Sequence, residues 1–170
     1  MTTAQRGALL VLAGAPGAGK TTLLPHLIEQ AAGLVVIDMD EILEDGALLG
    51  VPIATADAAP IWPAYNRLWN RFLDIVRRSG SAVLMLSPTP SPGEVDGPDS
   101  DAARGQWALL DCPDEIRRAR LAARGWTEAQ IADAMTDART TRALLSTVFD
   151  GTEHPKELAE QVLVWVAQHR

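Results

Sequence analysis

The sequence predicts a three-layer α/β fold, in which a parallel sheet of five strands is covered by helices on both faces. Short apolar runs alternate along the chain with longer segments of helical periodicity, and a glycine-rich segment joins the first run to the first helix. The 170 residues, 47% hydrophobic and 22% charged, suit one domain with its own core. We therefore expect residues 1–170 to form a single α/β domain.

The expected strands are apolar runs that end on small or acidic residues, where a loop to the next helix begins. They cover residues 8–13, 34–38, 82–87, 106–111 and 146–150. The segments of helical periodicity cover residues 19–31, 61–79, 113–124, 127–145 and 155–169. Thr127 before Glu128 and His154 before Pro155 are typical helix starts.

Two segments lack both periodicities. Residues 87–101 hold four prolines and two glycines, which predicts a mobile loop. Residues 45–60 also indicate irregular structure.

Composition excludes several classes of function. The formal net charge of -7 would repel a polyanion, so neither a broad nucleic-acid surface nor membrane-surface binding is expected. The one cysteine, Cys112, excludes an intrachain disulfide and fits a buried position in a reducing compartment. No apolar stretch reaches the ~18 to 20 residues that span a bilayer, and no signal peptide is indicated, so we expect a cytoplasmic protein.

A phosphate-binding motif follows the first expected strand. The pattern G-x-x-x-x-G-K-[ST] is matched at every fixed position, and Thr22 continues it into the helix. Backbone amides at the start of that helix favour an anion, Lys20 would neutralise phosphate charge, and the Thr21 hydroxyl would ligate Mg²⁺. The alternative is a chance glycine-rich turn. The expected ATP-binding residues are Gly14, Ala15, Pro16, Gly17, Ala18, Gly19, Lys20, Thr21 and Thr22.

Two carboxylates follow the second expected strand. Asp38 and Asp40 would lie at the sheet edge where ligands bind, and residues two apart in an extended strand face the same side. We predict that Asp40 is the base for an acceptor hydroxyl and that Asp38 is a partner of the metal. The alternative makes Asp40 a helix N-cap and Asp38 a simple strand-end acid.

The segments GAPGAGKTT and IDMDEIL resemble small P-loop kinases of the nucleoside-monophosphate-kinase type, among them shikimate, gluconate and polynucleotide kinases and chloramphenicol phosphotransferase. This resemblance spans most of the chain. It implies the P-loop NTPase fold with strand order 2-3-1-4-5 and a short lid near residues 117–130. It also places an acceptor-side region near residues 41–72, with the aspartate at position 40 beside the acceptor hydroxyl. The third strand ends without the second acid found in many P-loop proteins, although Ser87 is suited to bind Mg²⁺ through water.

Arginines cluster in the segment after the fourth strand. Arg117, Arg120 and Arg124 fall at i, i+3 and i+7, on one helical face. The pattern resembles the lid of these kinases, which implies that Arg120 and Arg124 contact the transferring phosphate. Arg139 and Arg142 are weaker candidates, and the alternative for each arginine is a solvated surface position.

An aromatic stripe marks the expected acceptor side. Trp62, Tyr65 and Trp69 fall on one helical face, as either core residues or a wall of the acceptor site. The predicted substrate residues are Asp40, Trp62, Tyr65, Asn66 and Arg67, with Arg71 as a further polar candidate. This segment and the proline-rich loop also resemble, more loosely, the bacterial tunicamycin-resistance protein.

These patterns predict an ATP- and Mg²⁺-dependent phosphotransferase that acts on a hydroxyl of a small molecule, either nucleoside-like or an antibiotic. The alternative is a protein that binds ATP and a ligand, as a switch or by sequestration, without transferring phosphate. Neither the acceptor nor the oligomeric state follows from the sequence.

Overall fold

The fold is built around a parallel β-sheet whose central strand is buried throughout. The computed structural model describes residues 6–53, 56–96 and 105–170. The sheet contains β1 (Leu9–Ala13), β2 (Leu34–Asp38), β5 (Ala82–Ser87), β6 (Gln106–Asp111) and β7 (Val148–Asp150). Its order is β2-β5-β1-β6-β7, so the predicted order 2-3-1-4-5 along the chain is confirmed.

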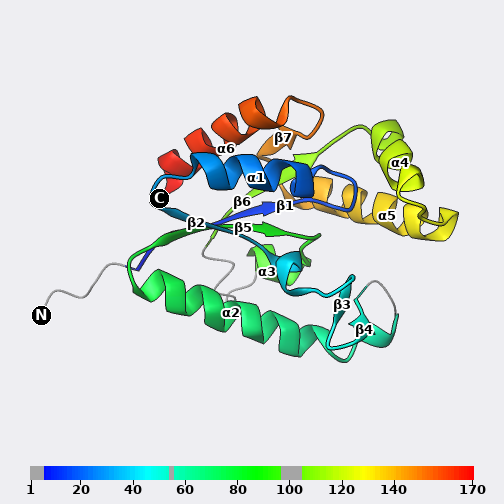
Figure 1. Cartoon of the computed structure of the whole chain (residues 1–170), viewed down its shortest axis with the longest axis horizontal. Coiled ribbons are helices and arrows are strands. Elements are labelled where there is room, and N and C mark those ends of the chain that lie inside the picture. The colour runs from blue at the N-terminus through cyan, green and yellow to red at the C-terminus, as the bar shows by residue number, and fades with distance from the viewer. Residues whose placement is uncertain (1–5, 54–55, 97–104) are drawn as a thin grey trace, which may run out of the picture.

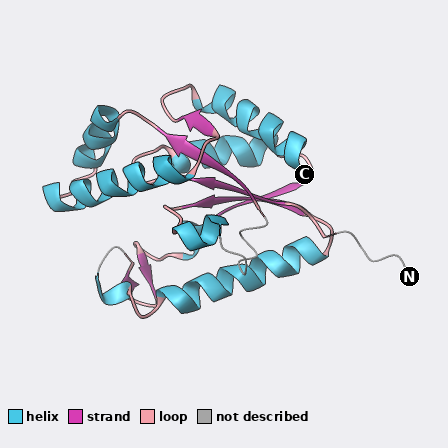
Figure 2. Cartoon of the chain, turned by 180° about the vertical axis from the view of Figure 1, so that it is seen from behind, coloured by secondary structure: helices cyan, strands magenta, loops and turns pink. Residues whose placement is uncertain are grey.

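Helices cover both faces of this sheet (Figures 1 and 2). α1 (Lys20–Gln30) and α6 (Pro155–His169) lie on one face, and α2 (Trp62–Arg78) lies on the other. The alternation of β1 produces this division, because Leu10 and Leu12 join the core with α1 and α6 while Leu9 and Val11 join the core with α2. The predicted three-layer class is therefore confirmed.

Two further helices form the lobe beside the glycine-rich loop. α4 (Asp114–Ala123) and α5 (Glu128–Leu144) are joined by a short turn and share a small apolar cluster of Leu121, Ile131, Ala134 and Met135. Thr127 caps α5 as expected, since its side chain accepts a hydrogen bond from the Gln130 amide. Of the described residues, none belongs to a helix long and apolar enough to cross a membrane.

The prediction of irregular structure for residues 45–60 is wrong in part. β3 (Ala47–Leu48) and β4 (Val51–Pro52) form an antiparallel hairpin, and the 3-10 helix η2 (Ala56–Ala58) follows in the chain. Leu49 and Gly50 join the two strands with φ angles of 52° and 81°, the left-handed conformation that a two-residue hairpin turn requires. Glycine at one of two turn positions is a weak signal.

The proline-rich loop also contains a helix that was not predicted. α3 (Pro92–Asp96) begins after Ser91, whose amide and hydroxyl both donate to the Glu94 carboxylate. Local capping therefore starts one helical turn despite the prolines. The rest of that predicted loop, residues 97–101, lies outside the described residues.

Candidate functional site

The glycine-rich loop runs from β1 to α1 at the carboxyl edge of the sheet. Gly17 and Gly19 have φ angles of 81° and 115°, a conformation that side chains with a Cβ rarely adopt. No side chain caps the start of α1, and no acid lies in its first turn. The first amides of α1 are thus arranged as in a site for phosphate.

Lys20 is the first residue of α1, directly after this loop, and its ammonium group donates to the Gly14 carbonyl oxygen. Loss of hydration lowers the pKa of Lys20, while the charges of Asp40 and Asp38 oppose that shift. The two carboxylates therefore lie near enough to Lys20 to stabilise its positive charge.

Arg117 supports the loop from beneath. Its side chain is fully buried and donates to the carbonyl oxygens of Ala15 and Pro16, at 3.2 and 2.6 Å, and to the Asp111 carboxylate. Arg142 holds the same carboxylate from α5 and also pairs with Asp114. These bonds hold the carbonyl groups of the loop in place, so Arg117 is a buried anchor of the loop and not a solvated arginine.

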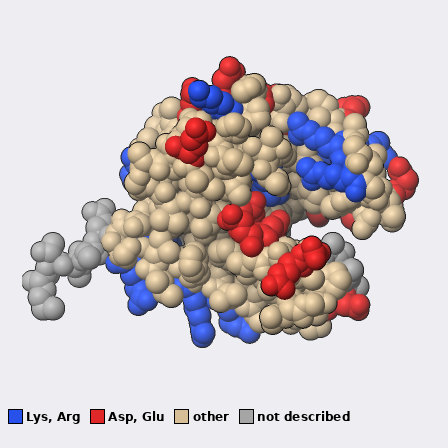
Figure 3. Space-filling model, viewed as in Figure 1, with Lys and Arg blue, Asp and Glu red and all other residues tan. Residues whose placement is uncertain are grey.

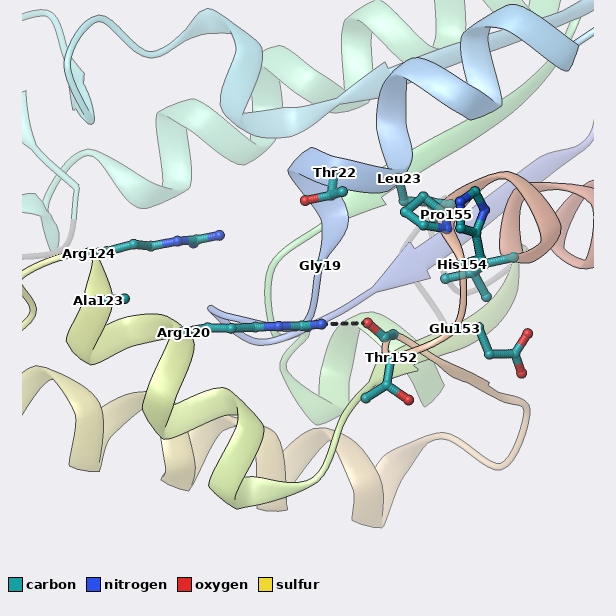
Figure 4. Close-up of a pocket in the computed structure, with 12 residues that line it drawn as sticks. Gly19, Thr22, Leu23, Arg120, Ala123, Arg124, Thr152, Glu153, His154 and Pro155 are labelled. Atoms are coloured by element: carbon teal, nitrogen blue, oxygen red, sulfur yellow. Dashed lines mark hydrogen bonds between the residues drawn. The ribbon is translucent and has the colours of Figure 1, made fainter.

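Arg120 of α4 and Arg124, the C-cap residue of that helix, both extend toward the loop that carries Gly19 (Figure 4). Arg120 donates to the carbonyl oxygens of Gly17 and Ala18, at 3.1 and 3.2 Å, and to Gly151 at 2.9 Å. Arg124 is exposed and lies near enough to Lys20 to lower the pKa of its ammonium. The two arginines border a pocket of about 630 Å³ between α1, α4 and the loop that follows β7.

A larger cavity of about 910 Å³ lies on the other side of the loop. Lys20, Thr21, Asp38 and Asp40 line it, together with side chains of α2 and α5. In Figure 3, basic side chains gather on the lobe of α4 and α5, and acidic side chains face them across a hollow. The sheet edge thus brings the predicted phosphate loop and both predicted carboxylates to one cavity.

The geometry of the acidic pair differs from the prediction. Asp40 does not continue β2 but lies in the 3-10 helix η1 (Met39–Ile42). Asp38 is the N-cap, since its carboxylate accepts from the Asp40 amide at 3.0 Å, and burial raises the pKa of Asp38. The prediction that Asp38 and Asp40 face one side as strand residues was therefore wrong. The alternative, in which Asp40 is the helix N-cap, was also wrong, because Asp38 holds that position. Asp40 is exposed on the cavity wall.

The predicted acceptor residues separate into two groups. Trp62 and Asn66 line the large cavity. Tyr65 is 2% exposed, and its hydroxyl donates to the Met39 carbonyl oxygen at 2.6 Å, so it packs in the core under η1. Arg67 and Arg71 are exposed and are not among the residues that line the cavity, because they lie on the outer face of α2. The geometry thus argues against Tyr65, Arg67 and Arg71 as contacts of the acceptor.

Tyr65→Phe is expected to lower the free energy of unfolding by about 1 to 2 kcal/mol, because the buried Met39 carbonyl loses its hydrogen-bond donor. The melting temperature should fall by about 4 °C, while the KM for the acceptor stays unchanged. Asn66→Ala is the matched comparison, since Asn66 lines the cavity and should change the KM without changing the melting temperature. If Tyr65→Phe raised the KM for the acceptor and kept full stability, Tyr65 would be a contact of the acceptor after all.

The weaker arginine candidates lie away from the phosphate loop. Arg142 holds Asp111 and the Cys112 carbonyl, and Arg139 donates to the Thr136 hydroxyl on its own helix. Arg118, which pairs with Glu128, is exposed. Cys112 is buried as expected, and its thiol contacts the Gly17 carbonyl oxygen at 3.6 Å.

Several residues that line the large cavity were not predicted from the sequence. They come from α3, β6 and α5, and include Glu94, Trp107, Gln130, Asp133 and Asp137. Asp133 and Asp137 are four positions apart (i and i+4), so helical periodicity alone could have placed them on one face of the helix. Nothing in the local sequence predicts which ligand that face meets.

The oxygen donors of the cavity suit Mg²⁺. Thr21, Asp38 and Ser87 line it beside Lys20, and hydroxyl and carboxylate oxygens are the ligands that this ion prefers. Among the described residues, no group of three or more His, Cys, Asp or Glu side chains is arranged to hold a metal.

Comparison with known proteins agrees with this geometry. The family described as the AAA domain matches residues 10–142, more than half of the chain. No curated protein matches the sequence at a significant level. Among solved structures, a sugar kinase from a Janibacter species is 20% identical with a TM-score of 0.67, and the match covers 95% of each chain.

Two other solved structures have the same fold. Shikimate kinase from Acinetobacter baumannii is 18% identical with a TM-score of 0.63, over 98% of this chain and 96% of that one. The tunicamycin resistance protein of Deinococcus radiodurans is 19% identical with a TM-score of 0.60, over 95% and 96%. These likenesses confirm, at the level of the fold, the resemblance to small P-loop kinases.

Proposed function

The chain belongs to the AAA-domain family of P-loop proteins, and from this premise we propose that it is an ATP- and Mg²⁺-dependent small-molecule kinase. The proposal depends on one observation above all: a single cavity holds the phosphate loop, with Lys20 and Thr21, and the exposed carboxylate of Asp40. A donor phosphate bound at the loop and an acceptor hydroxyl bound at Asp40 would therefore lie next to each other in this cavity.

The nucleotide would lie across the glycine-rich loop. The pocket of about 630 Å³ beside Arg120 and the segment after β7 suits the adenosine part of ATP. The backbone amides of Gly17, Gly19, Lys20 and Thr21 would bind the phosphates, and the γ-phosphate would face the larger cavity. Arg120 already bonds three backbone carbonyls and would hold this arrangement together.

The transfer step requires a base and stabilisation of charge. Asp40 would accept the proton of the acceptor hydroxyl while that oxygen forms a bond to the γ-phosphorus. The bond from this phosphorus to the bridging oxygen would break, and ADP would leave with the electron pair. Lys20 and the exposed Arg124 would stabilise the negative charge on the transferring group.

Thr21 and Asp38 would hold Mg²⁺, with Ser87 bonded to it through water. When bound, the ion neutralises phosphate charge and orients the phosphates. Burial of Asp38 in the cavity wall favours such a partner, since a nearby cation would offset the cost of its buried charge.

A second candidate function is binding without transfer, as in a protein that sequesters an antibiotic. The observation that favours it is the end of β5, where Ser87 stands in place of a second metal-binding acid. The fold shared with the tunicamycin resistance protein is compatible with either function.

Release of ADP in the presence of an acceptor separates the two functions. The protein is incubated with ATP, Mg²⁺ and panels of nucleosides, aminoglycosides and sugar alcohols, and ADP and phosphorylated product are measured. A kinase forms both in proportion to the acceptor, and Lys20→Met should abolish this signal. Tight binding of a panel member without product would favour sequestration.

Arg124→Ala is expected to lower kcat about 100-fold with little change in stability, because an exposed side chain that stabilises the transition state is removed. Steady-state kinetics and thermal unfolding measure the two effects. Arg118→Ala is the control, since Arg118 comes from the same helix and pairs with Glu128 at the surface. Equal activity of both variants would exclude Arg124 from the transfer step.

A further inference from the structure

The large cavity is lined by more carboxylates than cations. Lys20 and Arg124 are the cations among the described residues that line it, and the proposed function places both at the phosphates. α5 adds the carboxylates of Asp133 and Asp137 to the lining. Neither carboxylate forms an ion pair or a side-chain hydrogen bond with another described residue.

These two carboxylates lie four residues apart on one face of α5. Burial and the charge of Asp133 together raise the pKa of Asp137. A pair of like charges at this spacing destabilises a helix unless a positive group lies nearby. None of the described residues of α5 that line the cavity supplies such a group, so the pair is suited to a positive charge on a ligand.

The same cavity has an aromatic wall. Trp62 and Trp69 from α2, Trp107 from β6 and Trp126 from the turn after α4 all line it. Four of the five tryptophans of the chain thus border one cavity, while Trp165 packs against Phe149 in a different part of the core. Indole rings together with carboxylates form the surroundings in which proteins bind ammonium groups.

We propose that the acceptor is a cationic alcohol, an amine-bearing sugar or related polyol, whose ammonium group is held by Asp133, Asp137 and the tryptophans. This inference rests on the proposed kinase function, because it names the class of molecule that the same cavity accepts. A hydroxyl of the ligand lies at Asp40. Asp133 and Asp137 select the substrate and take no part in the chemical step.

Tryptophan fluorescence tests the inference without relying on catalysis, since most of the indoles border the cavity. D-glucosamine is titrated beside D-glucose and D-glucuronate, and kanamycin beside its N-acetylated form, in the presence of ADP and Mg²⁺. In at least one set we expect the amine to bind about tenfold more tightly than its neutral counterpart, as ammonium recognition by aromatic rings and carboxylates requires. If no amine is preferred in either set, including when nothing binds, the inference is overturned.

The variant Asp133→Asn/Asp137→Asn should reduce that preference to about twofold or less, since both charges that attract the ammonium are removed. Glu160→Gln is the matched control, because Glu160 is an exposed carboxylate on α6 and is not among the residues that line the cavity. Thermal unfolding verifies that the double variant is folded. Should it fail to fold, the single variant Asp133→Asn, at an exposed position, replaces it. Full preference in a folded variant also overturns the inference.

Measurement of ADP with the same probes distinguishes the two proposals. Charge-dependent binding of amines without phosphorylated product would contradict the kinase function and leave the ligand class intact. Phosphorylation of neutral or anionic acceptors, with no preference for amines, would support the kinase function and contradict the ligand class.

Discussion

Asp40→Asn is expected to abolish phosphoryl transfer and to leave ATP binding nearly intact. The amide has the shape of the carboxylate but cannot accept the proton of the acceptor hydroxyl, so kcat should fall on the order of 10²- to 10⁴-fold. Asp40 is exposed on the cavity wall, and its backbone amide, not its side chain, makes the bond to Asp38. The fold of η1 should therefore persist. Product formation and the Kd of a fluorescent ATP analogue measure the two effects.

Glu41→Gln is the control for Asp40→Asn. It also neutralises one carboxylate of η1, and the amide oxygen can still accept from the Asp38 backbone amide. This variant should keep most of its activity. Full turnover by Asp40→Asn would disprove its role as the base, and loss of ATP binding would move Asp40 to the nucleotide or metal side of the site.

Arg117→Leu is expected to cause the largest loss of stability of any substitution in α4. It removes the buried arginine from the Asp111 carboxylate, which then keeps only Arg142, and it leaves two loop carbonyls without this donor. The loss should cost about 3 to 5 kcal/mol of unfolding free energy. The melting temperature should fall on the order of 10 °C, as measured by circular dichroism. ATP affinity should fall too, because the loop loses its anchor.

Arg118→Leu provides the comparison at the next position of the helix. Its ion pair with Glu128 is exposed, so the free energy of unfolding should change by less than about 1 kcal/mol. If Arg117→Leu were as stable as Arg118→Leu and only slowed transfer, Arg117 would belong with the phosphate-contacting arginines and not with the scaffold.

Much of the fold follows from local patterns in the chain. The five sheet strands and five of the helices lie within about two residues of the predicted ranges, because buried parallel strands and amphipathic helices have distinct periodicities. The glycine-rich loop is equally local: its residues, their spacing and the flanking strand and helix are contiguous. The hairpin at Leu49 and the short helix at Pro92 were missed because brief elements carry too few residues to show a period.

The sequence by itself thus determined the sheet, the layers, the phosphate loop and the pair Asp38 and Asp40 at the sheet edge. Only the tertiary structure decided the roles within each pattern. Three arginines share one helical spacing, but their environments differ. Arg117 is buried and anchors the loop, Arg120 donates hydrogen bonds to backbone carbonyls, and Arg124 is exposed. Periodicity places side chains on a face, but the charges and carbonyls that meet that face come from segments far apart in the chain, and those partners decide what each side chain does.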